Sequence, residues 1–263
     1  MTSAPAVPGA NSRAVLVACM PKSGSTFLSA ALASLPGYRR EHIVPSYARR
    51  EQEMSETEIQ RAFAATQTLR RAFDQGELVS PQRPRAWVAQ LHVKHTHETQ
   101  TLVDRYGIVP VCLVRNIYDI LVSLRDHFVN DSPLTAAAYV EESMVGWDEE
   151  RMYAFLVDMA VPWYLHFYVS WAKAEQKVLV TYEDLVADPP GELRRILKAG
   201  QLPWNSEGIA EALEKVAGGD QGKVRRNVGT TGRGAVIGPD LRARVESYCN
   251  YYPDVDFRPL GIA

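Results

Sequence analysis

AVLVACMPKSGSTFLSAALASL, residues 14–35, decides the fold class, because it places an apolar run, a tight turn and a helical run in immediate succession. The apolar run at 14–20 has the composition of a central strand in a parallel sheet. The run at 26–35 has the spacing of a helix. The turn at 20–26 combines glycine, hydroxyl side chains and a lysine, which indicates a loop that binds an anion. It is not a Walker loop, because Lys22 precedes the only glycine of the turn.

The alternation of strand and helix continues along the chain. Strands that alternate with helices imply a parallel sheet with helices on both faces, that is, a three-layer α/β/α fold. The remaining strands are predicted at 86–93, 108–114 and 177–182. Helices are predicted at 56–74, 96–107, 117–128, 189–199, 206–217 and 239–249, with a mostly helical segment at 133–174.

Length and composition describe an ordinary globular chain. Its 263 residues are 46% hydrophobic and carry a net charge of −2, which gives no indication of a nucleic-acid partner. Residues 1–12 are expected to form a disordered tail and 13–263 a single domain. The sequence has neither a signal peptide nor a membrane span, and Cys19 and Cys112 fall in apolar strands. These features predict a cytoplasmic protein in a reducing compartment.

Residues just past the predicted strands are the first candidates for a site, because ligands of such sheets bind outside the carboxyl ends of the strands. Basic and hydroxyl side chains fall there, and they suit an anionic ligand. After the first strand come Lys22, Ser23, Gly24, Ser25 and Thr26; after the second, His92; after the third, Arg115 and, eight residues on, Ser123; after the fourth, Tyr182.

Four of these stretches resemble motifs of one family, the sulfotransferases that use 3′-phosphoadenosine 5′-phosphosulfate (PAPS). PKSGSTFL resembles its 5′-phosphosulfate loop and VRNIYDILVSL its 3′-phosphate motif. KVLVTYEDLVADP is similar to the strand and loop that contact adenine, and RRNVGTTGRG resembles the bacterial form of its C-terminal loop. The matches run in family order from residue 15 to about 234. The resemblance implies a sulfotransferase fold, similar to that of P-loop NTPases, with PAPS as co-substrate and PAP as product.

The resemblance also implies roles for individual residues. Lys22 would contact the phosphosulfate and neutralise the leaving oxygen, and Arg115 and Ser123 would hold the 3′-phosphate. Lys22, His92 and Ser123 are the residues expected to be catalytic. Phe27 replaces the family's usual tryptophan beside the adenine. No metal is implied, since lysine, arginine and helix N-termini supply the positive charge. The cofactor residues carried over are Lys22, Ser23, Gly24, Ser25, Thr26, Phe27, Arg115, Ser123, Tyr182, Arg225, Arg226 and Gly229.

The catalytic base is expected in QLHVKHTHETQTLVD, which resembles a segment where the family often has Lys-Thr-His. This register places His92 at the base and Gln90 where the family lysine stands. His95 and His97 are the alternatives. The same histidines allow a metal interpretation, but no carboxylate or cysteine completes a site at the usual ligand spacing.

Other interpretations remain open beside sulfuryl transfer. A P-loop-type small-molecule kinase and a non-catalytic nucleotide-binding module would use the same sheet. The acceptor would be a hydroxyl or amine of a small molecule, glycan or lipid, and the variable segments 38–54 and 128–165 would shape its pocket. The pairs Arg39/Arg40 and Arg49/Arg50 are interpreted as solvated surface charge or as contacts for an anionic acceptor. A homodimer is compatible with the sequence.

Overall fold

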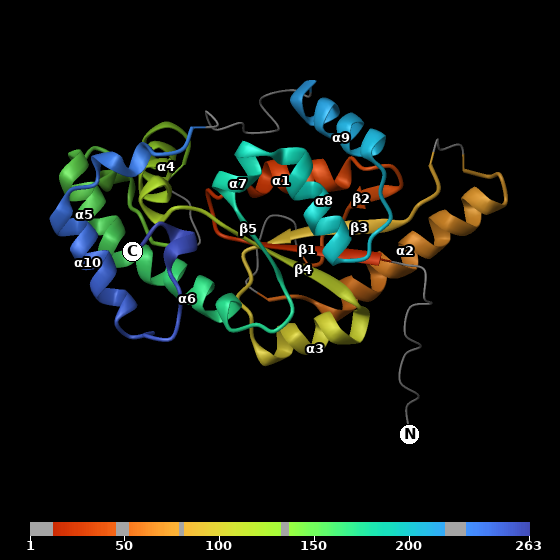
Figure 1. The fold of residues 1–263 in the computed structure, drawn as a ribbon, viewed down its shortest axis with the longest axis horizontal. Coiled ribbons are helices and arrows are strands. Elements are labelled where there is room, and N and C mark those ends of the chain that lie inside the picture. Colours follow the sequence, from red (N-terminus) through yellow and green to blue (C-terminus); the bar gives the residue numbers. More distant parts are fainter. Residues whose placement is uncertain (1–12, 46–52, 79–81, 133–136, 219–229) are drawn as a thin grey trace.

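A computed structural model describes residues 13–45, 53–78, 82–132, 137–218 and 230–263. Its centre is one sheet of five parallel strands in the order β2-β3-β1-β4-β5 (Figure 1). The predicted three-layer α/β/α fold is therefore confirmed. The strands are β1 (Arg13–Cys19), β2 (Tyr38–Arg40), β3 (Ala86–Leu91), β4 (Ile108–Val114) and β5 (Val178–Thr181).

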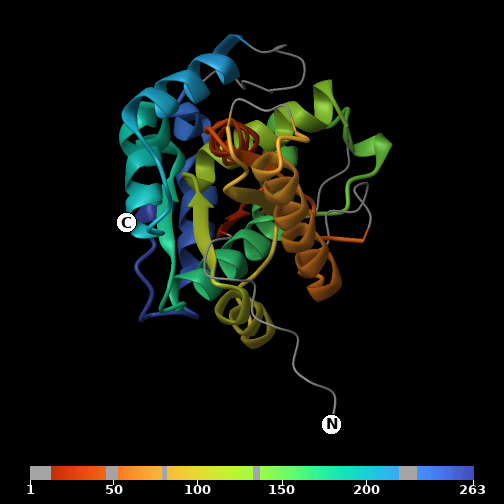
Figure 2. The same cartoon turned by 90° about the vertical axis from the view of Figure 1, so that its right-hand side faces the viewer.

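Helices cover both faces of the sheet. Figure 2 shows α8 and α9 on one side of the strands and α2 on the other. In Figure 1, α4, α5 and α10 gather beyond the carboxyl ends of the strands. The helices are α1 (Ser25–Ala33), α2 (Glu56–Asp74), α3 (His97–Tyr106), α4 (Ile117–Asn130), α5 (Glu149–Met159), α6 (Val161–Ala172), α7 (Tyr182–Ala187), α8 (Pro189–Ala199), α9 (Ser206–Gly218) and α10 (Pro239–Cys249), with short 3₁₀ turns at Glu142–Met144, Arg233–Val236 and Arg258–Leu260.

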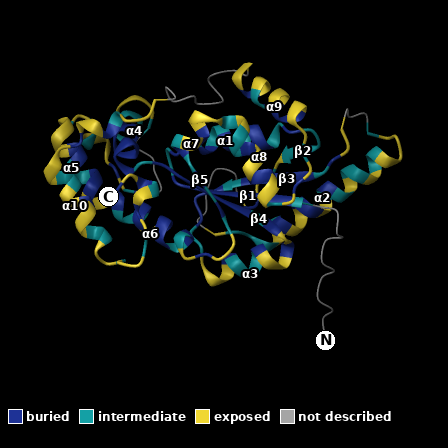
Figure 3. Ribbon diagram, viewed as in Figure 1, coloured by how far each residue is buried: buried dark blue, intermediate teal, exposed yellow. Residues whose placement is uncertain are grey.

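Two hydrophobic layers hold these helices to the sheet. Successive strand residues point to opposite faces, so the seven-residue β1 supplies both layers: Val15 and Val17 face α1, α8 and α9, whereas Leu16 faces the side of α2, α3 and α6. Figure 3 shows buried residues along the strands and on the inward sides of the helices. Burial on both faces explains why β1 reads as a continuous apolar run rather than an alternating one.

The sequence missed two short elements. Residues 38–40 form β2, an edge strand in which only Tyr38 is buried, so its polar sequence gave no strand signal. The predicted strand at 177–182 ends at Thr181, and Tyr182 begins the helix α7. Thr181 caps that helix by accepting a hydrogen bond from the backbone N–H of Asp184, a spacing that could have predicted it. The expected tail at 1–12 lies outside the described residues.

Strand order places the loop after β1 at the centre of one edge. From β1 the chain passes through α1 to β2, on the β3 side of β1, whereas from β4 it continues to β5 on the opposite side. Ligands of parallel sheets bind at the carboxyl edge where the chain direction reverses in this way. The ends of β1 and β4 are therefore where a site is expected. No helix among the described residues is both long and apolar enough to cross a membrane.

Candidate active site

The loop from β1 to α1 has a backbone shape that few residues tolerate. Both Lys22 (φ 67°) and Gly24 (φ 82°) are in the left-handed region. A Cβ atom at Gly24 would lie 2.7 Å from the ring of Tyr182, so glycine is required for space as well as for conformation. Gly24 is also the N-cap of α1, and no side chain caps this helix. The first N–H groups of α1 are thus available to an anion.

Serines fix the inside of the same loop. Ser23 is fully buried and its hydroxyl donates to the carbonyl oxygen of Met20 (2.7 Å). Ser25 is buried at the first position of α1 and accepts a hydrogen bond from the side-chain amide of Gln90 (2.8 Å). Thr26 and Phe27 follow in the first turn, where Phe27 packs against the core on the α1 side of the sheet.

Arg115 lies directly after β4 and reaches this loop. Its guanidinium donates to the carbonyl oxygens of Lys22 (3.1 Å) and Thr230 (3.2 Å) and lies 4.1 Å above the ring of Tyr182. The side chain is only 3% exposed, and its Nε atom is a buried donor with no hydrogen-bond partner among the residues that the structure describes. An unpartnered buried donor costs free energy, which an anionic ligand would recover.

Asp119 is a site residue that the sequence interpretation missed. It lies on the first turn of α4, 3.5 Å from Arg115, and accepts hydrogen bonds from the backbone N–H groups of Gly232 (2.9 Å) and Gly234 (2.7 Å). Asp119 therefore joins the C-terminal segment to the arginine. Its spacing of four residues from Arg115 was the available signal. Ser123 lies one turn further along α4 and is 1% exposed.

The half-buried acid Glu183 lies beside this arginine. Its carboxylate accepts a hydrogen bond from the backbone N–H of Asn116 (3.1 Å), the N-cap of α4. Burial raises the pKa of Glu183 above its usual value, although that hydrogen bond and the charge of Arg115 act in the opposite direction. Burial is thus the dominant influence on this carboxyl group.

His92 lies just past β3 and turns toward β1. It is 4% exposed, and its Nδ1 atom is 2.8 Å from the carbonyl oxygen of Cys19, the last residue of β1. A carbonyl oxygen can only accept, so Nδ1 carries the hydrogen. In the neutral ring the lone pair is then on Nε2, the arrangement of a histidine oriented to take a proton.

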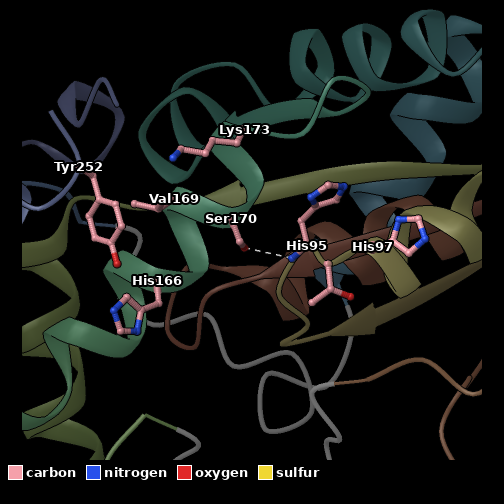
Figure 4. A pocket seen from close by; sticks show the side chains of 8 residues that line it. His95, His97, His166, Val169, Ser170, Lys173 and Tyr252 are labelled. Atoms are coloured by element: carbon pink, nitrogen blue, oxygen red, sulfur yellow. Dashed lines mark hydrogen bonds between the residues drawn. The ribbon is translucent and has the colours of Figure 1, made fainter. Parts of the chain in front are cut away.

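His95 and His97 lie elsewhere. They line a hollow of about 410 Å³ together with His166, Lys173 and Tyr252 (Figure 4). This hollow lies between the start of α3 and the second half of α6, and none of the predicted cofactor residues lines it. The backbone N–H of His95 donates to the hydroxyl of Ser170 (3.0 Å; Figure 4). The side-chain Nε2 of His95 forms a hydrogen bond with the side-chain oxygen of Gln100 (2.8 Å).

The remaining predicted positions can be placed as follows. Tyr182 is 6% exposed and lies between Gly24 and Arg115. Arg225, Arg226 and Gly229 lie outside the described residues. Within the described ranges, no group of three or more His, Cys, Asp or Glu side chains is arranged to hold a metal ion.

Fold and site together describe an α/β protein with a glycine- and serine-containing loop, contacted by Arg115, at the centre of the carboxyl edge of its sheet. A model of the sulfotransferase family matches residues 14–206, so the chain belongs to the sulfotransferase family. This confirms the resemblance and the enzyme class expected from the four motifs. Comparison with curated proteins gives no match.

Solved structures share the fold at low sequence identity. A mouse sulfotransferase, SULT7A1, solved with PAP, is 14% identical with a TM-score of 0.57; the alignment covers 93% of this chain and 85% of the mouse chain. Retinol dehydratase, solved with androsterone and PAP, is 15% identical with a TM-score of 0.53, over 96% of this chain and 83% of its own. These similarities establish the fold.

Proposed function

We propose that this protein transfers a sulfuryl group from PAPS to a hydroxyl or amine of a small-molecule, glycan or lipid acceptor. The observation that carries the proposal is the contact between Arg115 and the carbonyl oxygen of Lys22. This contact brings the residue expected at the 3′-phosphate to the loop expected at the phosphosulfate. One bisphosphorylated nucleoside can therefore reach both groups.

The residues present suit such a substrate. Within the described ranges Arg115 has a buried Nε without a hydrogen-bond partner, and a phosphate oxygen readily accepts from such a donor. Among the described residues, no side chain caps the α1 N-terminus, and the glycine at its start lets the ring of Tyr182 pack directly against the loop. Both mouse SULT7A1 and retinol dehydratase were solved with PAP, which supports the same ligand class here. Ser23, Gly24, Ser25 and Thr26 would hold the 5′-phosphate.

The chemistry asked of the chain is proton removal and charge stabilisation. PAPS supplies the sulfuryl group, which moves from a phosphate oxygen to the acceptor atom and leaves PAP. His92 would take the acceptor's proton on Nε2, because Nδ1 is held by the Cys19 carbonyl. Lys22 would offset the negative charge that develops on the leaving phosphate. His95 and His97 line a separate hollow, which favours His92 as the base.

A calorimetric titration tests the proposal. The wild-type protein should bind PAP, and Lys22→Ala and Arg115→Ala should each weaken that binding by roughly tenfold or more, as expected for a lost charge-assisted contact. His92→Ala should leave PAP binding intact. The small-molecule kinase is the alternative: binding of ATP with Mg²⁺ but not of PAP would establish it and contradict sulfuryl transfer.

A further inference from the structure

The side chain of Gln90 connects the predicted phosphosulfate loop to the edge strand β2. Its amide nitrogen donates to the hydroxyl of Ser25 (2.8 Å), at the start of α1. Its amide oxygen accepts from the hydroxyl of Ser29 (2.9 Å) and from the guanidinium of Arg40 (3.0 Å), the last residue of β2. Through this amide, a cation on the edge strand is tied to the anion-binding loop.

Among the residues that the structure describes, no carboxylate forms an ion pair with Arg40. Its neighbour Arg39 forms an ion pair with Glu41 and further hydrogen bonds to α2. Arg61, on α2, pairs with both Glu41 and Glu58. Arg40 is exposed, and across the described parts of the chain its one hydrogen bond is to the neutral amide of Gln90. A cation held in place by a neutral group keeps its charge for a ligand.

Arg40 and Arg115 approach the loop from opposite flanks of β1. Arg115 follows β4 and contacts Lys22, whereas Arg40 ends β2 and reaches Ser25 through β3. Two hydrogen bonds and one amide group separate the Arg40 guanidinium from the Ser25 hydroxyl, a spacing comparable to the Debye length of roughly 8 Å at physiological salt. The charge therefore acts on a ligand at the start of α1 without being fully screened.

We infer that Arg40 is a further binding residue of this enzyme, supplying positive charge to the 5′-phosphosulfate end of the nucleotide. This inference rests on the proposed function. If the 3′-phosphate lies at Arg115, the 5′ end of the same nucleotide lies at α1, on the side of Gln90 and Arg40. The inference also accounts for Gln90, the neutral residue that stands where the sulfotransferase resemblance expects a lysine. The positive charge comes from Arg40 on the neighbouring strand instead.

The test compares two nucleotides that differ at the 5′ end only. Calorimetry would measure the binding of PAP and of adenosine 3′-monophosphate, which lacks the 5′-phosphate. Arg40→Gln should weaken PAP binding by roughly tenfold and leave adenosine 3′-monophosphate unchanged, as expected for the loss of one nearby charge. Arg40→Lys keeps the charge and should retain most of the affinity. Arg71→Gln is the matched control, because Arg71 is an exposed arginine on α2 that makes no ion pair within the described ranges.

The outcomes separate this inference from the proposed function. If Arg40→Gln binds PAP as well as Arg71→Gln does, or if it weakens both nucleotides equally, Arg40 does not serve the 5′ end. An affinity of Arg40→Lys as low as that of Arg40→Gln would also overturn the inference, because the charge would then not be the cause. Failure of the wild-type protein to bind PAP at all would instead contradict the proposed function.

Discussion

The helices α1 and α3 each follow the carboxyl end of a neighbouring strand, α1 after β1 and α3 after β3, and their N-termini are capped in opposite ways. α1 has Gly24 as its N-cap, no side-chain cap and no acidic residue in the first turn. α3 has Thr96 as its N-cap, whose hydroxyl accepts from the backbone N–H of Thr99 (3.1 Å). Glu98 adds a carboxylate there, and its hydrogen bonds to its own backbone N–H and to Thr96 lower its pKa.

The difference shows where an anion can be bound. The start of α3 already has its own carboxylate and hydroxyl, so the basic side chains around the nearby hollow do not make it an anion site. The start of α1 keeps its N–H groups and has Arg115 and Lys22 beside it. A helix N-terminus is thus informative only together with the residues that cap it.

The largest expected effect separates the histidines of the two regions. His92 contacts the end of β1, whereas His95 lies at the start of α3. His92→Ala should lower kcat by about 10²–10⁴, the usual contribution of a general base. His95→Ala should leave kcat close to the wild-type value. The measurement is sulfuryl transfer from radiolabelled PAPS, with the acceptor identified by screening phenols, sugars and lipids.

Unchanged PAP binding by both variants is the control, since neither histidine is assigned to the nucleotide. A kcat that falls for His95→Ala and not for His92→Ala would move the base to the α3 region.

A carboxylate at the start of α1, like the one at the start of α3, should make the α1 N-terminus a poor site for an anion. Gly24→Asp places a carboxylate at the N-cap, close to the expected 5′-phosphate, and its Cβ meets the ring of Tyr182. Repulsion, competition for the N–H groups and the close contact should together weaken PAP binding by roughly 100-fold. Calorimetry measures the affinity, and a far-ultraviolet circular dichroism spectrum checks that the variant folds. PAP affinity close to wild type would show that the α1 N-terminus does not hold the nucleotide.

The sequence predicts the fold well where local signals are strong. The strand, turn and helix at 14–35 follow from an apolar run, a glycine turn and helical spacing, and they appear almost at the predicted bounds. Long-range contacts are what the sequence could not supply. That Asp119 accepts from Gly232 depends on how the C-terminal segment packs against α4, and that Arg40 reaches Ser25 through Gln90 depends on strand order; no local pattern encodes either.

The same limit applies to the site. The spacing of Arg115 and Ser123 suggested one ligand group, but only the fold places Arg115 against Lys22. In the sequence, His92 is preferred over His95 and His97 only by the register of the family resemblance. The structure separates them, because the strand ends at Leu91 and the chain then turns toward α6, taking His95 away from β1.

Removing the α3 cap should affect stability and not binding. Thr96→Ala deletes the hydroxyl that accepts from Thr99 N–H, and the loss of such a cap typically costs about 1 kcal/mol of unfolding free energy. PAP affinity should not change, because this helix is not assigned to the nucleotide. Urea denaturation gives the stability and calorimetry the affinity. A loss of PAP affinity would contradict the separation of the two helix starts.

The smallest effect is in the pH dependence of stability, where Glu183, beside Arg115, and Glu98, at the start of α3, should have opposite signs. Burial raises the pKa of Glu183 above its usual 4.5, so the folded state favours the protonated acid. The stabilising contribution of Glu183 is therefore present below pH 4.5 and is lost as the pH rises through the pKa of the folded state. Hydrogen bonds lower the pKa of Glu98 below 4.5, so its contribution is present above pH 4.5 and is lost as the pH falls through the folded pKa. Relative to wild type, Glu183→Gln should therefore gain Tm between pH 4 and pH 7, whereas Glu98→Gln should lose it. Thermal melts of the three proteins across this range measure both trends, and trends of the same sign would contradict the assignment of the two carboxylates to different environments.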